Sequence, residues 1–521
     1  MGDIIPPMTL QRRCSYIEFA EELYPSVWSL KLLCLVPKTR DRPSSMEKLQ
    51  VLLRHPIFCN LFLLLVYVQA CSNLAMAGSI VKFLPGFEGP LPFELETGYI
   101  GVGESEDVQL FYAFIKSESN PQSDPLIIWL DGGPGCSSFI PLFFGIGPVI
   151  LEPLSFDGTL PKLVLNPSTW TKVVSIIFLD SPVGTGFSYA KTAKASQSSD
   201  FQASDQAYEF IRKWLHDHPE YKSNPFYVSG ISYGGIPVPI LTQLISNGNE
   251  DGIEPRIDLK GYILGNPITK VSGILNYRVP FAYGMGLISD ELYESLKVSC
   301  KGEYEIIDPS NAACSKNMQA YNELVRNIDD QQILIPVCPP LSREPNKLFT
   351  GGRSIIQMLY KKFEELDVRE STPVKCRMEW ITLVDHWANN KSVQEALHVR
   401  RETIGQWVSC SDTLPYTENA GSVVPYHANL STKGYRSLIY SGDHDLLAPH
   451  IETQAWIRSL HYPIIDDWRQ WIHEGQVAGY TRTYANKMTF ATVKGGGHVA
   501  YEFKPAECRI MLERWILHQP L

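Results

Sequence analysis

Residues 226–240 read Phe226-Tyr-Val-Ser-Gly-Ile-Ser-Tyr-Gly-Gly-Ile-Pro-Val-Pro-Ile240 and give the clearest indication of the architecture. Phe226 to Val228 predicts a buried strand, and Pro237 to Ile245 predicts the start of a helix. Between them, Gly-Ile-Ser-Tyr-Gly places Ser232 on a sharp turn with its hydroxyl exposed, an arrangement typical of a serine nucleophile. A glycine turn with a helix-capping serine is the alternative at this point.

Other apolar runs along the chain resemble 226–228 and predict further strands that are covered on both faces. They are 126–130, 173–179, 261–264, 438–440 and 488–493. Residues 200–215 predict a helix with Asp200 as N-cap, and one face of it carries Phe201, Ser204, Ala207, Tyr208, Ile211, Trp214 and Leu215. Alternating strands and helices predict an α/β fold with a mostly parallel central sheet.

The alternation lapses between about residues 271 and 435. This region is irregular and Pro-rich, as in Ile335 to Pro340, and it holds Cys300, Cys314, Cys338, Cys376 and Cys410. Because it lies between predicted strands, we interpret it as a cap inserted above the sheet and cross-linked by disulfides. A separate domain joined by a linker is less consistent with that position.

The N-terminal region, residues 1–77, predicts a secretory signal. Lys48 and Arg54 precede an apolar run over 57–68, which is too short to span a bilayer, and Ala75-Met-Ala77 is a small-residue cleavage signal. A signal preceded by 45 residues is unusual. We expect Met46 to be the true start, with residues 78–521 forming the mature, soluble domain. The alternative is a real extension that converts the signal into an anchor.

Secretion changes the interpretation of the cysteines. Seven of the eleven follow residue 77, and in an oxidising compartment they predict up to three disulfides and one free thiol. Spacing alone does not fix the pairing. Asn390-Lys-Ser and Asn429-Leu-Ser are N-glycosylation acceptors that fit the same compartment, although a motif this short can remain unused.

Charge and motifs argue against several classes of partner. The net charge is −10 and there is no run of basic residues, so we expect no nucleic-acid partner. The sequence contains no GxxxxGK[ST] phosphate loop, no CxxC pair and no HExxH zinc helix. It therefore indicates neither a cofactor nor a metal.

A nucleophilic serine requires a base and a carboxylate that orients the base, in the chain order Ser, Asp, His for this fold class. Asp443 and Asp445 follow one predicted strand, and His498 lies in a glycine loop after the last one. The residues alone leave open which aspartate is the partner. The glycines of Asp131 to Ser138 follow an early strand and would supply the N–H groups of an oxyanion hole, unless they form a simple turn.

Five motifs in this order resemble the serine carboxypeptidase family over about residues 80–520. They are W-L-D-G-G-P-G-C-S-S (129–138), L-D-S-P-V-G-T-G-F-S-Y (179–189), G-I-S-Y-G-G (230–235), S-G-D-H-D (441–445) and K-G-G-G-H (494–498). Residues 83–99 and 278–297 look most similar to the plant serine carboxypeptidase-like acyltransferases.

The resemblance implies an α/β-hydrolase core with a cap insertion, and it implies roles for individual residues. Ser232 would be the nucleophile, His498 the base and Asp445 the orienting carboxylate, with the N–H groups of Gly133 and Tyr233 as oxyanion donors. The implied disulfides are Cys136–Cys410, Cys300–Cys314 and Cys338–Cys376, which leaves Cys508 free. The family also implies a vacuolar or extracellular protein, either a monomer or a heterodimer cut within the insertion.

Three positions separate this chain from the peptidases of the family. There, an Asn and two Glu hold the C-terminal carboxylate of the substrate, whereas this chain has Asp131, Ile231 and Gly145. Ile231 and Gly145 offer no hydrogen bond, and a charged Asp131 would repel a carboxylate. Carboxypeptidase activity is therefore disfavoured. Gly145 also departs from the acyltransferases, where an acidic residue is common, and we expect it either to widen the pocket or to mark a different donor.

The resemblance instead implies transfer of an acyl group from a 1-O-acyl glucose ester to an acceptor hydroxyl through a seryl acyl-enzyme. Asp131 would then bind the glucose of this small-molecule donor. A serine carboxypeptidase or esterase is the alternative, and a catalytically silent binding protein is a third hypothesis.

Overall fold

The computed structural model describes residues 78–152, 159–270, 272–337 and 377–521, without the side chains of Met378 and Glu379. The predicted signal region and the predicted Cys338–Cys376 disulfide lie outside these residues.

The centre of the described part is a parallel sheet. Its six strands, in spatial order, are β7 (Ser175–Leu179), β4 (Leu126–Leu130), β10 (Phe226–Ile231), β11 (Leu259–Gly265), β13 (Arg436–Gly442) and β16 (Met488–Val493). Each predicted apolar run coincides with, contains or lies within one of them. The carboxyl ends of these strands therefore meet at one edge, where the candidate catalytic residues follow β10, β13 and β16.

Antiparallel strands extend this sheet on both sides to twelve described strands. On one side lie β1 (Ser79–Val81), β2 (Leu95–Val102), β3 (Val108–Ile115) and β8 (Tyr189–Ala190), and on the other β15 (Gln476–Tyr484) and β14 (Ile464–His473). The prediction of a mostly parallel sheet thus holds for the centre. The two-stranded ladders β5 (Val149–Leu151)–β6 (Leu163–Leu165) and β9 (Ser198–Ser199)–β12 (Tyr416–Thr417) lie apart from it.

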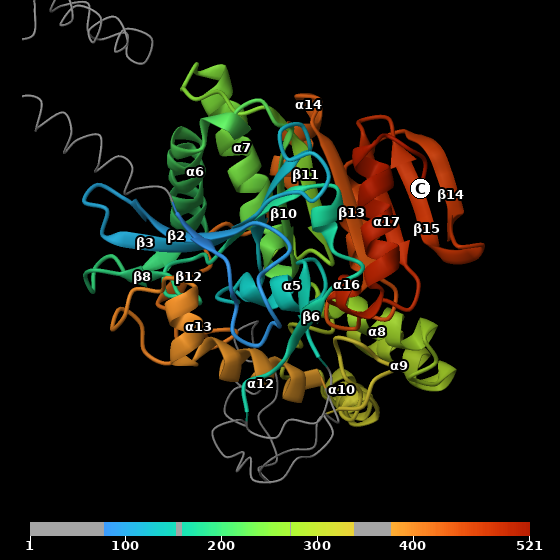
Figure 1. Ribbon diagram of the computed structural model, residues 1–521. Coiled ribbons are helices and arrows are strands. Elements are labelled where there is room, and N and C mark those ends of the chain that lie inside the picture. The colour runs from blue at the N-terminus through green and yellow to red at the C-terminus, as the bar shows by residue number, and fades with distance from the viewer. Residues whose placement is uncertain (1–77, 153–158, 271, 338–376) are drawn as a thin grey trace, which may run out of the picture. The chain divides into compact units, whose positions relative to one another are not determined.

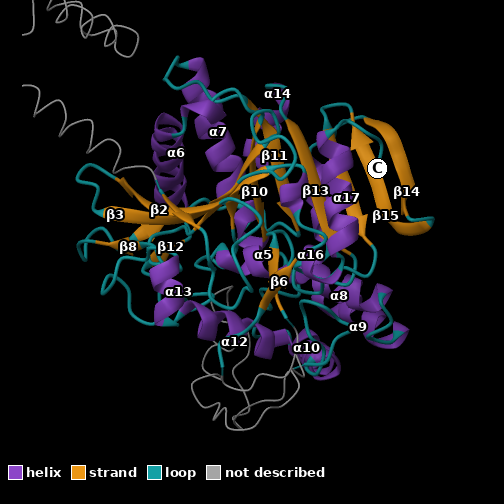
Figure 2. Ribbon diagram, viewed as in Figure 1, coloured by secondary structure: helices purple, strands orange, loops and turns teal. Residues whose placement is uncertain are grey.

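Helices cover both faces of the sheet (Figure 2). Side chains of β4 alternate between two cores, with Ile127 and Trp129 in one and Leu126 and Ile128 in the other. The first core includes residues of α5 (Phe139–Phe144), α12 (Arg377–Ala388), α16 (Ala500–Phe503) and α17 (Pro505–Ile516). The second includes residues of α6 (Asp200–Asp217), α7 (Pro237–Glu250), α14 (Val424–Thr432) and α15 (His450–Ser459). This three-layer arrangement is an α/β-hydrolase fold.

Helix α6 begins differently from the prediction. Ser199 is the N-cap, and its side-chain oxygen accepts a hydrogen bond from the N–H of Gln202 at 3.3 Å. Asp200 is the first helical residue and is completely buried. Its carboxylate does not cap the helix and instead accepts hydrogen bonds from groups outside it. Most of the predicted apolar face is buried. The exceptions are Phe201, which follows Asp200 and is 38% exposed, and Tyr208, which is partly exposed.

The insertion lies along one side of the sheet in Figure 1 and contains α8 (Leu275–Gly284), α9 (Asp290–Cys300), α10 (Ala312–Val325), α12 and α13 (Lys391–Ala396). The predicted Cys300–Cys314 disulfide joins α9 to α10, and the predicted Cys136–Cys410 disulfide joins the insertion to the loop after β4. Cys508 is free and buried, as predicted.

Helix α14, the last part of the predicted insertion, packs with the core helices instead. The Asn429 amide donates to Gln243 of α7 at 2.7 Å, and Leu430 is buried in the core. Among the described residues, no helix is both long enough and apolar enough to cross a bilayer.

Candidate active site

Ser232 lies where β10 turns into the short helical turn η4 (Ser232–Gly235), and its φ of +57° falls in the left-handed region. The two flanking glycines of the motif allow this turn to approach β4. A Cβ on Gly230 would lie 2.5 Å from the carbonyl oxygen of Leu130, and one on Gly234 would lie 2.7 Å from the same atom. The N-cap of α7 is Ile236, so Ser232 is not the cap of that helix. Ser232 remains partly exposed between buried neighbours, as a nucleophile requires.

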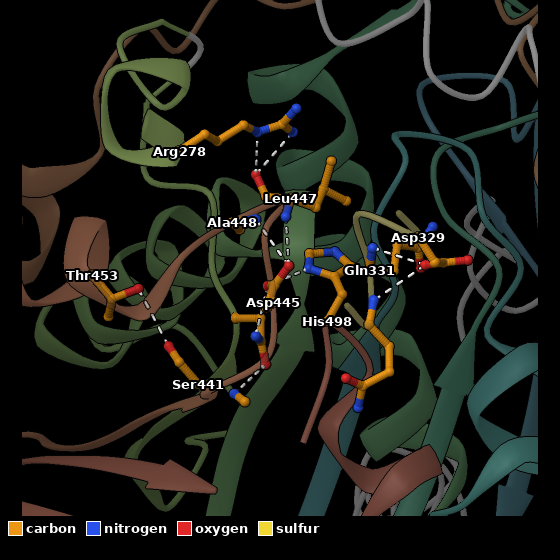
Figure 3. Close-up of polar contacts among 12 residues, drawn as sticks. Arg278, Asp329, Gln331, Ser441, Asp445, Leu447, Ala448, Thr453 and His498 are labelled. Atoms are coloured by element: carbon orange, nitrogen blue, oxygen red, sulfur yellow. Dashed lines mark hydrogen bonds and ion pairs between the residues drawn. The ribbon is translucent and has the colours of Figure 1, made fainter. Parts of the chain in front are cut away.

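The structure places Asp445, and not Asp443, beside His498. Asp445 Oδ2 lies 2.8 Å from His498 Nδ1, and both side chains are buried. Asp445 Oδ2 also accepts from the Asn266 amide at 2.7 Å, and its Oδ1 accepts from the N–H groups of Leu447 and Ala448 at 2.8 and 3.1 Å (Figure 3). These bonds fix the carboxylate against Nδ1, which leaves Nε2 as the ring nitrogen for the predicted role of general base. That role stays a prediction.

A segment of the insertion, residues 329–333, contacts both loops that carry these residues. The backbone N–H of His498 donates to the Gln331 carbonyl at 2.6 Å, and the N–H groups of Leu446 and Leu447 donate to the Asp330 carbonyl at 2.9 and 2.7 Å. Figure 3 shows Gln331 beside His498, and Arg278 donating to the Leu447 carbonyl. The sequence did not reveal this segment, because backbone contacts leave no signature in residue type.

The loop after β4 runs against the nucleophile. A Cβ on Gly132 would lie 2.8 Å from the Cβ of Ser232, so only glycine permits this approach. The N–H groups of Gly133 and Tyr233 donate to no described residue, and they therefore have the capacity to bind a developing oxyanion. Asp180 anchors the same loop through Ser137 Oγ and the Ser138 N–H, at 2.7 and 3.0 Å. The oxyanion role of Gly133 and Tyr233 stays a prediction.

Asp131 lies in this loop and lines a pocket together with Gly132, Pro134, Tyr233 and Tyr416. Its Oδ1 accepts from the Gly132 N–H at 2.6 Å, whereas Oδ2 is buried and has no hydrogen-bond partner among the described residues. Burial raises the pKa of Asp131 to about 7, although the Gly132 N–H and the Trp129 side chain act in the opposite direction. Burial thus makes Asp131 hold its proton more strongly than an exposed aspartate does, an effect that the sequence did not indicate.

The other two altered positions offer no polar group to this site. The Ile231 side chain is buried in the apolar core that contains Trp129 and Tyr501. A Cβ on Gly145 would lie 2.7 Å from a ring carbon of Tyr501 and 2.7 Å from its carbonyl oxygen. The expectation that Gly145 widens the pocket is therefore wrong, because Tyr501 occupies the space that a side chain would fill.

The two predicted glycosylation acceptors occupy different settings. Asn390 is the N-cap of α13, and its Oδ1 accepts from the Ser392 N–H at 2.9 Å. Asn429 is exposed within α14, where its amide contacts Gln243. Glycosylation of either residue stays a prediction.

Comparison with known proteins agrees with this geometry. A family profile described as serine carboxypeptidase matches residues 85–518. Serine carboxypeptidase-like 2 of Arabidopsis thaliana is 52% identical over 462 residues, which cover 89% of this chain and 98% of the relative. Serine carboxypeptidase-like 19 of the same plant is 51% identical over 474 residues, covering 90% and 100%. The crystal structure of a prohormone-processing carboxypeptidase from Saccharomyces cerevisiae shares the fold, with a TM-score of 0.65 at 19% identity over 86% of this chain and 96% of that one.

Proposed function

Because this chain belongs to the serine carboxypeptidase family, we propose that it uses Ser232 to transfer an acyl group from a 1-O-acyl glucose ester to an acceptor hydroxyl. The family supplies the enzyme class. Preference for transfer over peptide hydrolysis is the proposed part, and Asp131 is the observation that carries it.

Asp131 suits a sugar better than a peptide terminus. Its buried Oδ2 makes no hydrogen bond of ordinary geometry with a described residue, although the Trp129 side chain is close enough to lower the pKa of the carboxyl. This oxygen therefore has the capacity to accept from a substrate donor. A sugar hydroxyl both donates and accepts, so it can bond to Asp131 in either protonation state. A substrate carboxylate only accepts, so the charged form of Asp131 repels it. Ile231 and Gly145 add no donor that would compensate.

The proposed reaction uses the geometry of the site. Ser232 Oγ attacks the ester carbonyl while its proton passes to His498 Nε2, and Asp445 stabilises the resulting imidazolium. The oxyanion accepts hydrogen bonds from the N–H groups of Gly133 and Tyr233. When the C–O bond to glucose breaks, His498 returns the proton to the departing sugar oxygen. The acceptor hydroxyl then gives its proton to His498 and attacks the acyl carbonyl. The bond to Ser232 Oγ breaks, and His498 returns the proton to Oγ, which releases the product ester and the free enzyme.

Transfer competes with hydrolysis, so the acceptor must be positioned and water excluded. The insertion reaches the catalytic loops through residues 329–333, which makes it the proposed place for the acceptor. We propose further that the protein follows the secretory route to the vacuole or the exterior as a glycoprotein, either as a monomer or as a heterodimer cut within the insertion.

The proposal is tested with protein expressed from Met46 and a hydroxycinnamoyl or galloyl glucose ester. Glucose release and product mass are followed against a panel of alcohols and phenols, with a C-terminal dipeptide assay and Ser232→Ala in parallel. An acyl ester of an acceptor that is absent with Ser232→Ala supports the proposal. Free acid alone, or dipeptide cleavage as the faster reaction, contradicts it.

A carboxypeptidase is the second candidate, and the burial of the Asp131 carboxylate beside the pocket is the observation that favours it. With a pKa near 7, Asp131 is mostly protonated in an acidic compartment, where it can donate to a substrate carboxylate. This candidate requires dipeptide cleavage that rises as the pH falls below 7, and acyl transfer that stays slower than cleavage.

A further inference from the structure

Asp200, the first residue of α6, accepts four hydrogen bonds and has no exposed surface. The hydroxyl groups of Tyr233 and Tyr416 donate to its Oδ1 at 2.7 and 2.8 Å. The N–H groups of Asn419 and Ala420 donate to its Oδ2 at 2.6 and 2.8 Å. One buried carboxylate thus joins the nucleophile turn to the segment that leads out of the insertion.

Capping of the helix does not explain this arrangement. Ser199 already caps α6 through the N–H of Gln202, and the Asp200 carboxylate accepts from donors that lie outside the helix. A carboxylate buried at this depth needs several donors to remain there. Because Ser199 already starts the helix, a buried charge at position 200 is not needed for that purpose. We therefore look for the role of Asp200 at the groups that it contacts.

The first of these groups is attached to the nucleophile. Tyr233 directly follows Ser232, whose φ of +57° is unfavourable for a residue with a side chain. The backbone is held by two hydrogen bonds, from the Ile268 N–H to the Ser232 carbonyl at 2.8 Å and from the Ile236 N–H to the Tyr233 carbonyl at 2.9 Å. The bond from the Tyr233 hydroxyl to Asp200 fixes the far end of the Tyr233 side chain. This bond and the two backbone hydrogen bonds together restrain the position of the Tyr233 N–H.

The second group is the wall of the pocket beside Asp131. Tyr233 and Tyr416 both line this pocket, with ring centroids 6.4 Å apart and planes at 77°. Because both hydroxyls donate to the same carboxylate oxygen, the two rings are held relative to each other. A change at Asp200 therefore acts on the oxyanion donor and on the pocket wall together.

We propose that Asp200 is a positioning residue for the nucleophile turn, acting through Tyr233 on the oxyanion donor and through Tyr416 on the pocket wall. This proposal rests on the first half of the proposed reaction, in which Ser232 attacks an acyl carbonyl. It does not depend on the identity of the donor or the acceptor.

The test compares this cluster with a second buried carboxylate, Glu96, whose hydrogen-bond partners Tyr112 and His218 are not among the candidate site residues. Glu96 of β2 is 8% exposed and accepts from the Tyr112 hydroxyl at 2.6 Å, so Glu96→Gln and Tyr112→Phe match Asp200→Asn and Tyr233→Phe. Two rates are measured on each folded variant: labelling of Ser232 by a fluorophosphonate, and the acylation burst with p-nitrophenyl acetate. Thermal unfolding is recorded for all of them, and Tyr416→Phe is included.

We expect Asp200→Asn and Tyr233→Phe to slow both reactions about ten- to a hundred-fold, as a displaced oxyanion donor does, and to change KM much less than kcat. Tyr416→Phe should change KM for bulky aryl esters more than for the acetate. The Glu96 and Tyr112 variants should lose thermal stability while their acylation rates stay at the wild-type value.

The proposal is overturned if folded Asp200→Asn and Tyr233→Phe react at the wild-type rate, or slow no more than the control pair. If Asp200→Asn does not fold, Tyr233→Phe decides, because it removes a single hydroxyl. A wild-type protein that reacts with the fluorophosphonate but transfers no acyl group contradicts the proposed function and leaves this test intact.

Discussion

Asp445 Oδ2 lies 2.8 Å from His498 Nδ1, while Asp443, two residues earlier, accepts from the Gly495 N–H at 2.7 Å. The two carboxylates thus serve the same histidine loop in different ways. Asp445 contacts the imidazole, and Asp443 holds the backbone of the loop. The family resemblance had implied this assignment, which the residues alone left open.

This division gives a matched pair of substitutions. Asp445→Asn should lower kcat for acylation by about 10³- to 10⁴-fold, because it leaves the imidazole without its anionic partner and favours the wrong tautomer. In Asp443→Asn, the amide oxygen can still accept from Gly495, so activity should fall less than about ten-fold. Burst kinetics with an activated ester measure both. Equal losses would contradict the assignment.

The pKa of Asp131 makes stability depend on pH. Burial raises this pKa from its ordinary 3.8 to about 7, so the folded state binds more protons than the unfolded state between these values. Stability should therefore fall as the pH rises through this window, by at most about 1.4 kcal/mol per pH unit. Asp131→Asn has no charge to bury.

Urea unfolding at pH 5 and pH 8 checks this expectation. The asparagine variant should gain stability relative to the wild type on going from pH 5 to pH 8. A difference between the two proteins that does not change with pH would show that Asp131 titrates normally. A substitution at Gly132, whose N–H donates to Asp131, does not serve as a control, because a Cβ at this position collides with Ser232.

Glu96 and His218 form a buried ion pair between β2 and the end of α6, with His218 Nε2 3.0 Å from Glu96 Oε1. Burial opposes both charges, but the hydrogen bond and charge of the partner prevail, so the pKa of His218 is raised and that of Glu96 is lowered. Both ring nitrogens of His218 face acceptors, since Nδ1 lies 2.9 Å from the Trp214 carbonyl. The imidazolium is therefore the form that satisfies all of these groups.

The two shifts define the pH window of the pair. The contribution of His218 is complete below its ordinary pKa of 6.5 and is lost as the pH rises through the raised value. The contribution of Glu96 is present above 4.5 and is lost as the pH falls through the lowered value. His218→Phe should thus lower the free energy of unfolding most, by about 3 kcal/mol, between pH 4.5 and pH 6.5, where both contributions are present. Urea midpoints from pH 4 to pH 9 measure this cost, and a cost that grows above pH 8 contradicts it.

Arg377 connects the insertion to the helix after His498. Its Nε lies 2.9 Å from both carboxylate oxygens of Glu502, and its Nη1 donates to the Gln331 side chain at 2.9 Å. The pair is almost completely buried, so Arg377→Leu leaves an uncompensated carboxylate and should cost about 3–5 kcal/mol of stability. Because Gln331 also accepts from the His498 N–H, kcat should fall as well.

The control for Arg377 is the exposed pair between Arg469 and Asp466, whose side chains are 39% and 41% exposed. Arg469→Leu should cost less than about 1 kcal/mol, as surface pairs generally do, and leave kcat unchanged. Similar losses for the two variants, measured by urea unfolding, would contradict the structural importance of the buried pair.

The sequence predicted the central strands well, because a strand covered on both faces is continuously apolar, as Leu126–Leu130 and Met488–Val493 are. It did not predict β14, whose side chains are mostly exposed and mix polar with apolar residues. Local sequence predicts Asp200 as a helix cap, because its partners Tyr416 and Asn419 lie more than 200 residues away in the chain. Likewise, the charge of Asp131 depends on burial, which no local pattern encodes.

That the loops carrying Ser232, Asp445 and His498 lie at one edge of the sheet was predictable, because the loops that follow parallel strands meet there. Their catalytic roles stay predictions. The contacts of residues 329–333 were not predictable, because they involve backbone atoms of a region without regular patterning.

The most direct test of acyl transfer is the fate of the acyl-enzyme. Protein is mixed with an acyl glucose ester, quenched at short times and weighed intact by mass spectrometry, with and without an acceptor alcohol. We expect one acyl group on Ser232, absent from Ser232→Ala, that disappears faster as acceptor is added and reappears as the acceptor ester. An acyl-enzyme that decays at the same rate with and without every acceptor, and yields only free acid, would identify the protein as a hydrolase and contradict the account.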